Sequence, residues 1–363
     1  MQKDLSIGNR KINNESPVFI IGEISANHNG KIENAIKLIR EAKKAGVDAI
    51  KLQTYTADTI TLDCKNEYFK IKQGTLWDGV TLYDLYKEAY MPWEWNEELF
   101  KVAKEEDIIC FSSPFDKTAV DLLEKFNVPA YKIASFEITD IPLIEYIASK
   151  GRPIIISTGV ADIKDIEEAL CACKRMNNNQ VILLKCTSSY PAPYEDMNLI
   201  TIGDMDKRFD CLVGLSDHSL GSEVSIAAVA LGAKVIEKHI ILNRAEGGTD
   251  SAFSMEMDEL KDMVDKIRNV EKAIGKIDYS INEKKKKNRE FCRSLFVSKD
   301  VKAGEILSEK NIRSVRPGYG LHPRYFKDVL GKNFKKDIEK GTPLSMDLIE
   351  GIKEWISKHF RFL

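Results

Sequence analysis

The chain has 363 residues, of which 43% are hydrophobic and 30% charged, and its 54 basic and 56 acidic residues give a formal net charge of −2. This composition is typical of a folded globular protein and excludes an intrinsically disordered chain. The balanced charge provides no overall attraction to nucleic acid or to an anionic membrane. At roughly 150 residues per domain, the length corresponds to about two domains.

The sequence shows no sign of membrane insertion or secretion. No segment approaches the roughly 18 apolar residues that a membrane-spanning helix needs, and residues 1–6 lack the apolar core of a signal peptide. The seven cysteines are odd in number and none has C-x-x-C spacing, which indicates neither a disulfide framework nor a zinc site. We therefore expect a cytoplasmic protein with reduced thiols.

Short apolar segments alternate with longer segments of helical periodicity in the first part of the chain. Eight of them are expected to form β-strands: 18–25, 49–55, 108–114, 130–135, 153–159, 181–188, 211–217 and 235–241. Helices are expected at 33–45, 117–126, 162–176, 222–231 and 257–274. Eight strand–helix units within about 250 residues predict an α/β fold, a (β/α)8 TIM barrel. An open doubly wound sheet is the alternative, although no G-x-G-x-x-G turn follows the first strand.

The remaining segments suggest the domain organisation. Residues 66–95 form an aromatic-rich insertion, expected either to shape a substrate pocket or to pack as an apolar flap on the barrel or on a partner subunit. We assign 1–275 to the barrel with an N-terminal extension and the basic segment 276–290 to a linker with a solvated helix. Repeated turn signals predict a small β-rich domain at 291–350, followed by a tail at 351–363 that is expected to be helical.

Chemistry-bearing residues cluster at the predicted strand ends, which in a barrel all point to one mouth. Lys51 and Lys132 are expected to point inward there, and a buried lysine is costly unless an anion pairs with it. Hydroxyl groups expected at the same mouth belong to Ser113, Ser135, Ser157 and Ser216. Ammonium and hydroxyl groups together suit a phosphate. Alternatively, the lysines pair with Glu23, Asp217 and Glu237 in a structural ion network.

Two histidines end neighbouring strands of the predicted barrel. His218 follows the seventh strand and His239 lies on the inward face of the eighth. Two imidazoles, with water and one carboxylate among Glu23, Asp217 and Glu237, suit a divalent cation such as Mn²⁺ that keeps open positions. The alternative is a histidine pair with a purely structural role.

Several segments, in order along the chain, resemble the sialic acid synthase family: 22–30 (GEISANHNG), 50–53 (IKLQ), 131–135 (YKIAS), 156–159 (ISTG), 214–219 (GLSDHS) and 236–239 (IEKH). Residues 293–295 (RSL) and 314–318 (SVRPG) are similar to the antifreeze-like (SAF) domain of that family. The resemblance runs from about residue 20 to residue 349. It implies a metal-dependent transferase that joins phosphoenolpyruvate to an amino-sugar aldehyde, giving a nonulosonic acid and phosphate.

The resemblance also implies roles for individual residues. Glu23, Glu237 and Asp217 would be catalytic, and Arg316 would reach the barrel mouth of a partner chain in a domain-swapped homodimer. His218 and His239 would bind Mn²⁺, with Mg²⁺ or Co²⁺ as alternatives. The residues that would bind phosphoenolpyruvate are Lys51, Ser113, Lys132, Ser135, Ser157, Ser188 and Ser216.

Within the family, residues 76–89, 92–95, 247–254 and 320–323 most resemble the branch that makes pseudaminic acid from 2,4-diacetamido-2,4,6-trideoxy-altrose. Neuraminate synthases tend to have Asn where this chain has Ser188, after Cys-Thr of the sixth strand. The branches that make N-acetylneuraminate or legionaminate are the alternatives, as is a non-catalytic sugar-binding protein with the same fold. In each case the expected partners are small molecules and a second copy of the chain, with no nucleic acid and no membrane.

Overall fold

The computed structural model describes residues 1–72, 74 and 77–351. The chain divides into two units, Met1–Gly275 and Lys276–Leu363. The helix expected in the tail, at 352–363, lies outside the described residues. In the described ranges, no helix is both long enough and apolar enough to cross a bilayer.

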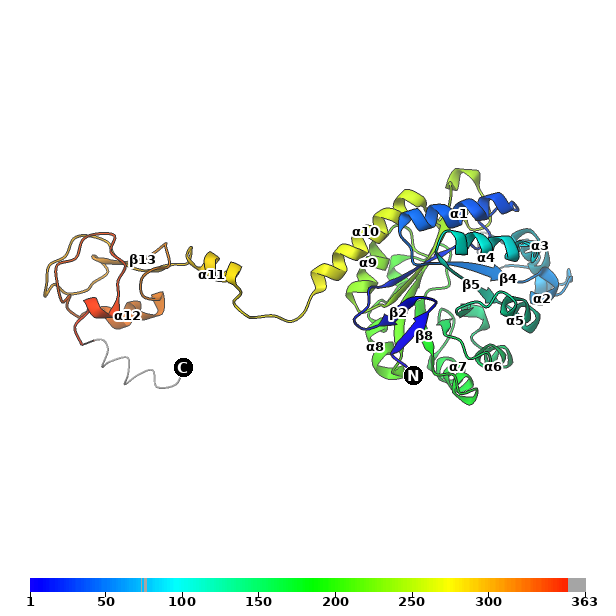
Figure 1. Ribbon diagram of the computed structural model, residues 1–363, viewed down its shortest axis with the longest axis horizontal. Helices are drawn as coiled ribbons and strands as arrows, with labels where there is room; N and C mark the ends of the chain where they lie inside the picture. The colour runs from blue at the N-terminus through cyan, green and yellow to red at the C-terminus, as the bar shows by residue number, and fades with distance from the viewer. Residues whose placement is uncertain (73, 75–76, 352–363) are drawn as a thin grey trace. The chain divides into compact units, whose positions relative to one another are not determined.

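Eight parallel strands close into a barrel in the described part of the first unit (Figure 1). Each strand pairs with the next along the chain, and the last returns to pair with the first as well as with its predecessor. This closure confirms the predicted (β/α)8 barrel and shows that the open doubly wound alternative is wrong. The strands are β3 (Phe19–Glu23), β4 (Ala49–Thr54), β5 (Ile109–Pro114), β6 (Tyr131–Ile133), β7 (Ile154–Ser157), β8 (Val181–Cys186), β9 (Leu212–Asp217) and β10 (Val235–Ile241).

Helices surround the barrel (Figure 1): α1 (Ile32–Ala45), α4 (Trp95–Glu105), α5 (Lys117–Glu124), α6 (Ile141–Ala148), α7 (Ile163–Arg175), α8 (Thr201–Phe209), α9 (Glu223–Ala230) and α10 (Met257–Ile274). Helix α1 turns Leu38 and Ile39 into the core and ends at Gly46, whose φ of 91° is costly for other residues. Helix α7 begins with a capping box between Asp162 and Asp165. Helices α4, α6 and α8 have no counterpart among the predicted segments.

The barrel strands are buried on both faces, because helices cover the outside and side chains fill the inside. Every residue of β10 is buried, charged ones included. Alternation along this strand turns Glu237 and His239 into the barrel and Lys238 toward the helices. An N-terminal hairpin, β1 (Asp4–Ile7) with β2 (Arg10–Asn13), adds Leu5, Ile7 and Ile12 to the same hydrophobic core.

The insertion at 66–95 contains helix α3 (Leu82–Ala89), which follows the short helix α2 (Ala57–Ile60). The Trp93 indole donates a hydrogen bond to the carbonyl of Tyr55, and the Tyr86 ring contacts the Tyr55 ring with centroids 5.7 Å apart. The insertion therefore packs on the segment that follows β4. A further short strand, β11 (Met255–Glu256), pairs with β10.

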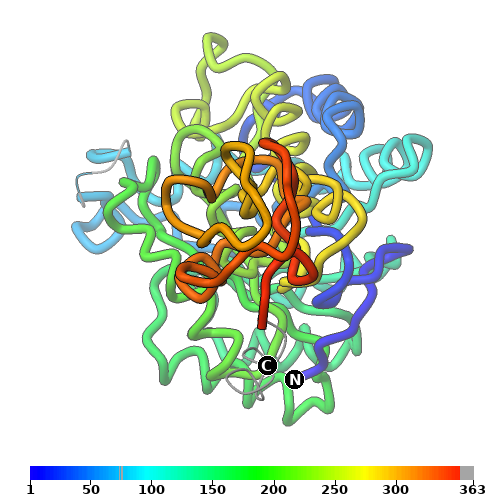
Figure 2. Tube along the Cα trace, turned by 90° about the vertical axis from the view of Figure 1, so that its left-hand side faces the viewer, coloured from blue at the N-terminus to red at the C-terminus, as the bar shows by residue number. Residues whose placement is uncertain are grey.

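The second unit is small and rich in turns (orange to red in Figure 2). Its helix α11 (Glu283–Arg289) is exposed along its whole length. Strands β12 (Ser294–Val297) and β13 (Ile312–Val315) pair in an antiparallel manner, and helix α12 (Phe326–Val329) follows. A separate hydrophobic core, which includes Leu295, Ile312 and Phe334, holds this unit together.

Candidate active site

Four charged side chains from four different strands meet inside the barrel. The Nζ atom of Lys51 lies 2.6 Å from Glu23 Oε2 and 3.5 Å from Glu237 Oε1. Lys132 Nζ lies 3.8 Å from Glu237 Oε1. None of these four residues is more than 3% exposed. The ion network that the sequence presents as the alternative to a phosphate site is therefore present, with Glu23 and Glu237 but without Asp217, which pairs with Lys238 instead.

Burial and neighbouring charges shift the pKa values of this cluster in different directions. Burial raises the pKa of Glu23, although Lys51 opposes the shift. Burial also acts to raise the pKa of Glu237, but Lys132, Lys51 and His218 together lower it below its usual range. Burial lowers the pKa of Lys132. The two carboxylates therefore differ in how readily they take up a proton.

Two serine hydroxyls contact the same charges, and a third is buried on a nearby strand. Lys51 Nζ donates to Ser113 Oγ at 3.3 Å, and Ser216 Oγ donates to Glu237 Oε1 at 3.1 Å. Ser157 Oγ is buried and has no hydrogen-bond partner. Ser157 ends β7, the neighbour of the strand that carries Lys132, and a buried hydroxyl without a partner is costly.

A second group of hydroxyls gathers around Gly159. Its backbone N–H donates to Ser135 Oγ at 3.3 Å, and Ser135 Oγ in turn donates to Cys186 Sγ at 3.4 Å. A Cβ atom at position 159 would lie 2.2 Å from Ser188 Oγ and 2.8 Å from Ser135 Oγ. Only glycine leaves room for these hydroxyls to approach the backbone so closely.

The two predicted metal-binding histidines lie face to edge, with ring centroids 5.2 Å apart. His218 Nδ1 is 3.0 Å from the carbonyl oxygen of Thr187, and an Nδ1–H that donates to this oxygen leaves Nε2 with a free lone pair. His239 Nδ1 is buried without a hydrogen-bond partner. The nearest carboxylate oxygen recorded for it is Asp250 Oδ2, at 3.9 Å.

This histidine pair fits an open cation site. Among the residues that the structure describes, no three His, Cys, Asp or Glu side chains form a group that could hold a metal ion. Two imidazoles, one of which has an unpartnered Nδ1 atom, suit a cation that keeps water or substrate oxygens in its other positions. They do not suit a closed site of the zinc-finger type.

Aromatic residues that the sequence analysis does not single out line the histidines. The Tyr190 ring lies 4.5 Å from His218 and the Phe253 ring 5.0 Å from His239, centroid to centroid. Trp77, from the insertion, contacts Tyr190 at 6.0 Å. Tyr190 and Phe253 follow β8 and β10, so their position in loops after strands was the signal that could have identified them. The insertion thus contributes to the surroundings of the site.

Other buried acids and thiols near the cluster also have no counterpart among the predicted site residues. Burial raises the pKa of Glu137, in the turn after β6, to about 7. Burial acts to raise the pKa of Cys186, but His218, Ser135 and Lys132 together lower it to about 7. Among the described residues all seven cysteines are free thiols.

Two predicted catalytic residues lie apart from these contacts. The carboxylate of Asp217 is engaged by Lys238 Nζ at 3.0 Å and by the hydroxyls of Ser219 and Ser225, each at 2.6 Å. Arg316 belongs to the second unit. The roles of both residues therefore remain predictions from the resemblance.

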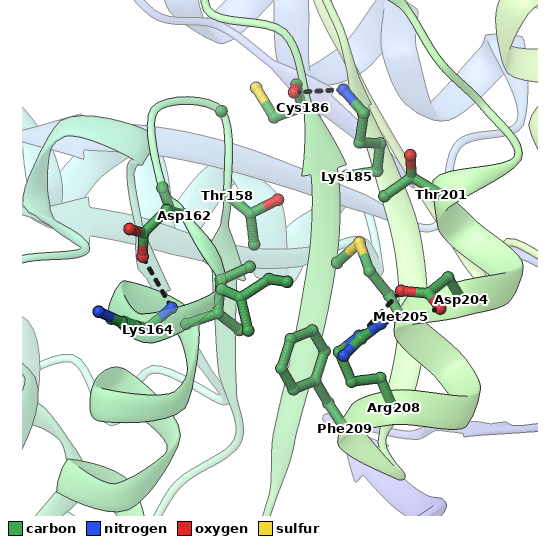
Figure 3. A pocket seen from close by; sticks show the side chains of 14 residues that line it. Thr158, Asp162, Lys164, Lys185, Cys186, Thr201, Asp204, Met205, Arg208 and Phe209 are labelled. Carbon is green, nitrogen blue, oxygen red and sulfur yellow. Dashed lines mark hydrogen bonds and ion pairs between the residues drawn. The ribbon is translucent and has the colours of Figure 1, made fainter.

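A cavity of about 560 Å³ lies between α7 and α8 (Figure 3). Lys185 reaches its edge and donates to the carbonyl oxygen of Cys186 at 2.7 Å, while Arg208 pairs with Asp204 inside it. None of the predicted site residues lines this cavity. Gly159 and Cys186, which both contact Ser135, do line it, so the cavity borders the hydroxyl groups around Gly159.

The fold and its charged strand ends define the class of protein, which is a (β/α)8-barrel enzyme. Two family models match the chain: "NeuB family" over residues 38–279 and "SAF domain" over residues 293–350. The chain belongs to the NeuB family, with a SAF domain after the barrel, as the resemblance predicts.

Known relatives agree with this assignment. The chain is 49% identical to a pseudaminic acid synthase of Campylobacter jejuni, over 94% of this chain and 98% of that protein. It is 38% identical to an N,N'-diacetyllegionaminic acid synthase of the same species, over 88% of this chain and 97% of that protein. Among solved structures, an N-acetylneuraminic acid synthetase of Leptospira borgpetersenii in complex with citrate is 32% identical, with a TM-score of 0.71, and covers 79% of this chain and 95% of its own.

Proposed function

We propose that this protein is a pseudaminic acid synthase. It condenses phosphoenolpyruvate with 2,4-diacetamido-2,4,6-trideoxy-altrose and releases phosphate. The observation that carries the proposal is the pair of buried lysines, Lys51 and Lys132, which converge on the same oxygen of Glu237 inside the barrel. The higher identity to the pseudaminic acid synthase, 49% against 38% for the legionaminic acid synthase, supports the choice of sugar.

Phosphoenolpyruvate takes its phosphate and carboxylate contacts from the lysines and hydroxyls at the strand ends. Lys51 and Lys132 supply charge, and the serines supply donors to the anionic oxygens. The residues assigned to this role are Lys51, Ser113, Lys132, Ser135, Ser157, Ser188 and Ser216. Because the donors belong to packed strands and the turns that follow them, they need little rearrangement when the ligand binds.

His218 and His239 hold a divalent cation, for which we propose Mn²⁺. When bound, the cation acts as a Lewis acid on the aldehyde oxygen of the open-chain sugar. The face-to-edge contact of the two rings, and the unpartnered Nδ1 atom of His239, support this assignment.

The reaction forms one carbon–carbon bond and breaks one carbon–oxygen bond. The methylene carbon of phosphoenolpyruvate attacks C1 of the sugar aldehyde, which becomes an alkoxide and then a hydroxyl. Water adds to the enol carbon, and phosphate leaves to give the 2-keto acid. Lys51 and Lys132 stabilise the charge on the leaving phosphate. We assign the proton released by water to the carboxylate pair Glu23 and Glu237, which share Lys51.

The sugar lies against Tyr190 and Phe253. Their aromatic rings give an apolar wall beside the histidines, which suits a 6-deoxy sugar better than one with a hydroxyl that needs a partner. This wall argues against N-acetylmannosamine. The 6-deoxy sugar used by legionaminate synthases remains the second candidate.

We further propose a cytoplasmic homodimer in which the SAF domain of each chain covers the partner's barrel through Arg316. The seven free cysteines support a reducing compartment. Light scattering of the purified protein measures the mass of the assembly, and twice the chain mass is expected.

Phosphate release tests the substrate. The purified enzyme with Mn²⁺ and phosphoenolpyruvate is given the altrose-configured 2,4-diacetamido sugar, its manno-configured epimer, or N-acetylmannosamine. The highest kcat/KM is expected with the altrose-configured sugar. Equal or better turnover of either other sugar contradicts the pseudaminate assignment, and no phosphate release with any of them favours the non-catalytic sugar-binding protein.

A further inference from the structure

A buried ion pair joins the two strands that carry the histidines. Lys238 Nζ lies 3.0 Å from Asp217 Oδ2, and the two side chains are 1% and 0% exposed. Lys238 and Asp217 are direct partners in the parallel register of β9 and β10. Each precedes a histidine in the chain, so the pair sits immediately before His218 on one strand and His239 on the other.

Further hydrogen bonds fix the pair on the outer side of the barrel wall. Lys238 also donates to the backbone carbonyl of Ser219. Asp217 Oδ1 accepts from the backbone N–H and from the hydroxyl of Ser219, at 2.9 and 2.6 Å. Asp217 Oδ2 accepts from the hydroxyl of Ser225 on α9, at 2.6 Å. The charges thus have partners on the strands, on the following turn and on a helix, as a buried pair requires.

These contacts act on the backbone beside each imidazole, together with the pairing of His239 with Glu23 on β3 and the contact of His218 with Thr187. The bonds from Ser219 to Asp217 hold the turn directly after His218, and the bond from Lys238 to Asp217 holds His239 in register with that turn. Without them, β9 and β10 remain paired, and His218 keeps its contacts with Ala192 and Thr187 of the loop after β8, but the link between the turn after Asp217 and β10 is lost. The spacing of the imidazoles is therefore set in part from the opposite face of the sheet, by groups that do not enter the barrel.

We propose that Asp217 and Lys238 are positioning residues that hold His218 and His239 at the separation a divalent cation needs. The inference rests on the proposed function for the identity of the cation. It assigns Asp217 a role different from the catalytic one that the resemblance implies, because every recorded contact of its carboxylate is with Ser219, Ser225 or Lys238.

Binding of Mn²⁺ to the full-length protein, measured by EPR titration, tests the proposal. Lys238→Met removes the charge of the side chain and keeps its length. Ser225→Ala removes a single hydrogen bond to Asp217 and is the milder variant, to be used if Lys238→Met does not fold. We expect Lys238→Met to weaken the Kd for Mn²⁺ about 10- to 100-fold, the usual range for residues that orient metal ligands, and Ser225→Ala to weaken it less. Lys238→Arg, which keeps the charge, should recover part of the affinity.

Asp48→Asn is the matched control. The Asp48 carboxylate also accepts from a backbone N–H of the barrel, that of Ile20, and pairs with Arg10 and Arg268. It precedes β4 and so lies at the opposite ends of the strands from the histidines. Asp48→Asn should lower the melting temperature and leave the Kd for Mn²⁺ unchanged.

Histidine signals in metal-free protein provide a second readout, since the chain has 5 histidines. For each variant we follow the ¹⁵N signal of the histidine on the opposite strand, because the histidine next to the substitution in the chain would be affected directly. The signal of His218 is therefore followed in Lys238→Met, and that of His239 in Asp217→Asn. Both ¹⁵N signals should shift, and neither should respond to Asp48→Asn.

Unchanged Mn²⁺ affinity and unchanged cross-strand signals in all pair variants overturn the proposal, as does an equal response to Asp48→Asn. A wild-type protein that binds no Mn²⁺ overturns the metal assignment of the proposed function instead. In that case the metal-free histidine signals still decide whether the pair positions the two rings.

Discussion

Lys51 and Glu23 form an ion pair of 2.6 Å inside the barrel, with side chains that are 4% and 0% exposed. Taking both charges out of water is expensive, and a pair of apolar side chains in their place is often as stable or more so. The pair is therefore better explained by what it binds than by what it stabilises. Lys132 and Glu237 extend it to two positive and two negative charges, which cancel.

A double variant separates the structural from the functional role of this pair. Lys51→Met alone leaves Glu23 buried without its partner and should destabilise the protein by about 3–5 kcal/mol. Lys51→Met with Glu23→Gln should recover most of that stability, measured by chemical denaturation, while turnover stays lost. Recovery of both stability and activity would show that Lys51 serves only the fold.

Gly159→Ala tests the role of the two serine hydroxyls, of Ser135 and Ser188, that approach the backbone at this position. The added Cβ would meet Ser188 Oγ and Ser135 Oγ at 2.2 and 2.8 Å, so we expect a higher KM for phosphoenolpyruvate with little change in melting temperature. Gly203→Ala is the control, because no atom lies within 4 Å of a Cβ there and alanine in helix α8 should stabilise by up to about 1 kcal/mol. Steady-state kinetics in which both variants match the wild type would refute the close-approach argument.

Metal removal should abolish turnover and also weaken phosphoenolpyruvate binding. Since the buried lysines are offset by carboxylates, trianionic phosphoenolpyruvate would need further positive charge, which a cation at His218 and His239 would provide. Calorimetry should show a lower Kd for phosphoenolpyruvate when Mn²⁺ is present. Phosphoenolpyruvate should lower the Kd for Mn²⁺ by the same factor, because the coupling between two ligands is reciprocal. Identical Kd values in both arms would contradict this coupling, and activity that survives full chelation would contradict the metal role.

Glu137 predicts a pH dependence of stability. Its folded-state pKa of about 7, raised by burial from 4.5, means that the folded protein favours the protonated carboxyl. The contribution of Glu137 to the free energy of unfolding is fully present below about pH 4.5. It is lost as the pH rises to 7 and above, which lowers the free energy of unfolding by roughly 3 kcal/mol. Glu137→Gln should remove this part of the dependence, measured by urea unfolding from pH 4.5 to 8, whereas exposed Glu105→Gln should not. Parallel curves for wild type and Glu137→Gln would refute the shift.

Arg316→Ala tests the role of the second unit. If this guanidinium completes the barrel site of a partner chain, its loss should lower kcat strongly and leave the mass of the assembly unchanged. Arg313→Ala removes an exposed charge three positions earlier in the same domain and should have little effect. Normal turnover of Arg316→Ala would show that Arg316 of the SAF domain does not contribute to catalysis.

Much of the fold could be predicted because the pattern of apolar residues is local. Segment 235–241 is buried at every position and was predicted at the same bounds that β10 has. Helix α1 ends at Gly46, as glycine at that position predicts. Helix α8 has no counterpart in the prediction, although Ile202, Met205 and Phe209 recur at helical spacing along it and all pack on the core.

The sequence by itself determined that Lys51, Lys132 and His239 lie on barrel strands and that His218 follows one, because strand order and side-chain alternation follow from residue spacing. Only the tertiary structure decided which charges pair. Asp217 and Glu237 lie on adjacent strands, yet Asp217 meets Lys238 on one face and Glu237 meets Lys51 on the other. Likewise, Tyr190, Phe253 and Asp250 come to the histidines from loops whose paths depend on packing, which no local pattern encodes.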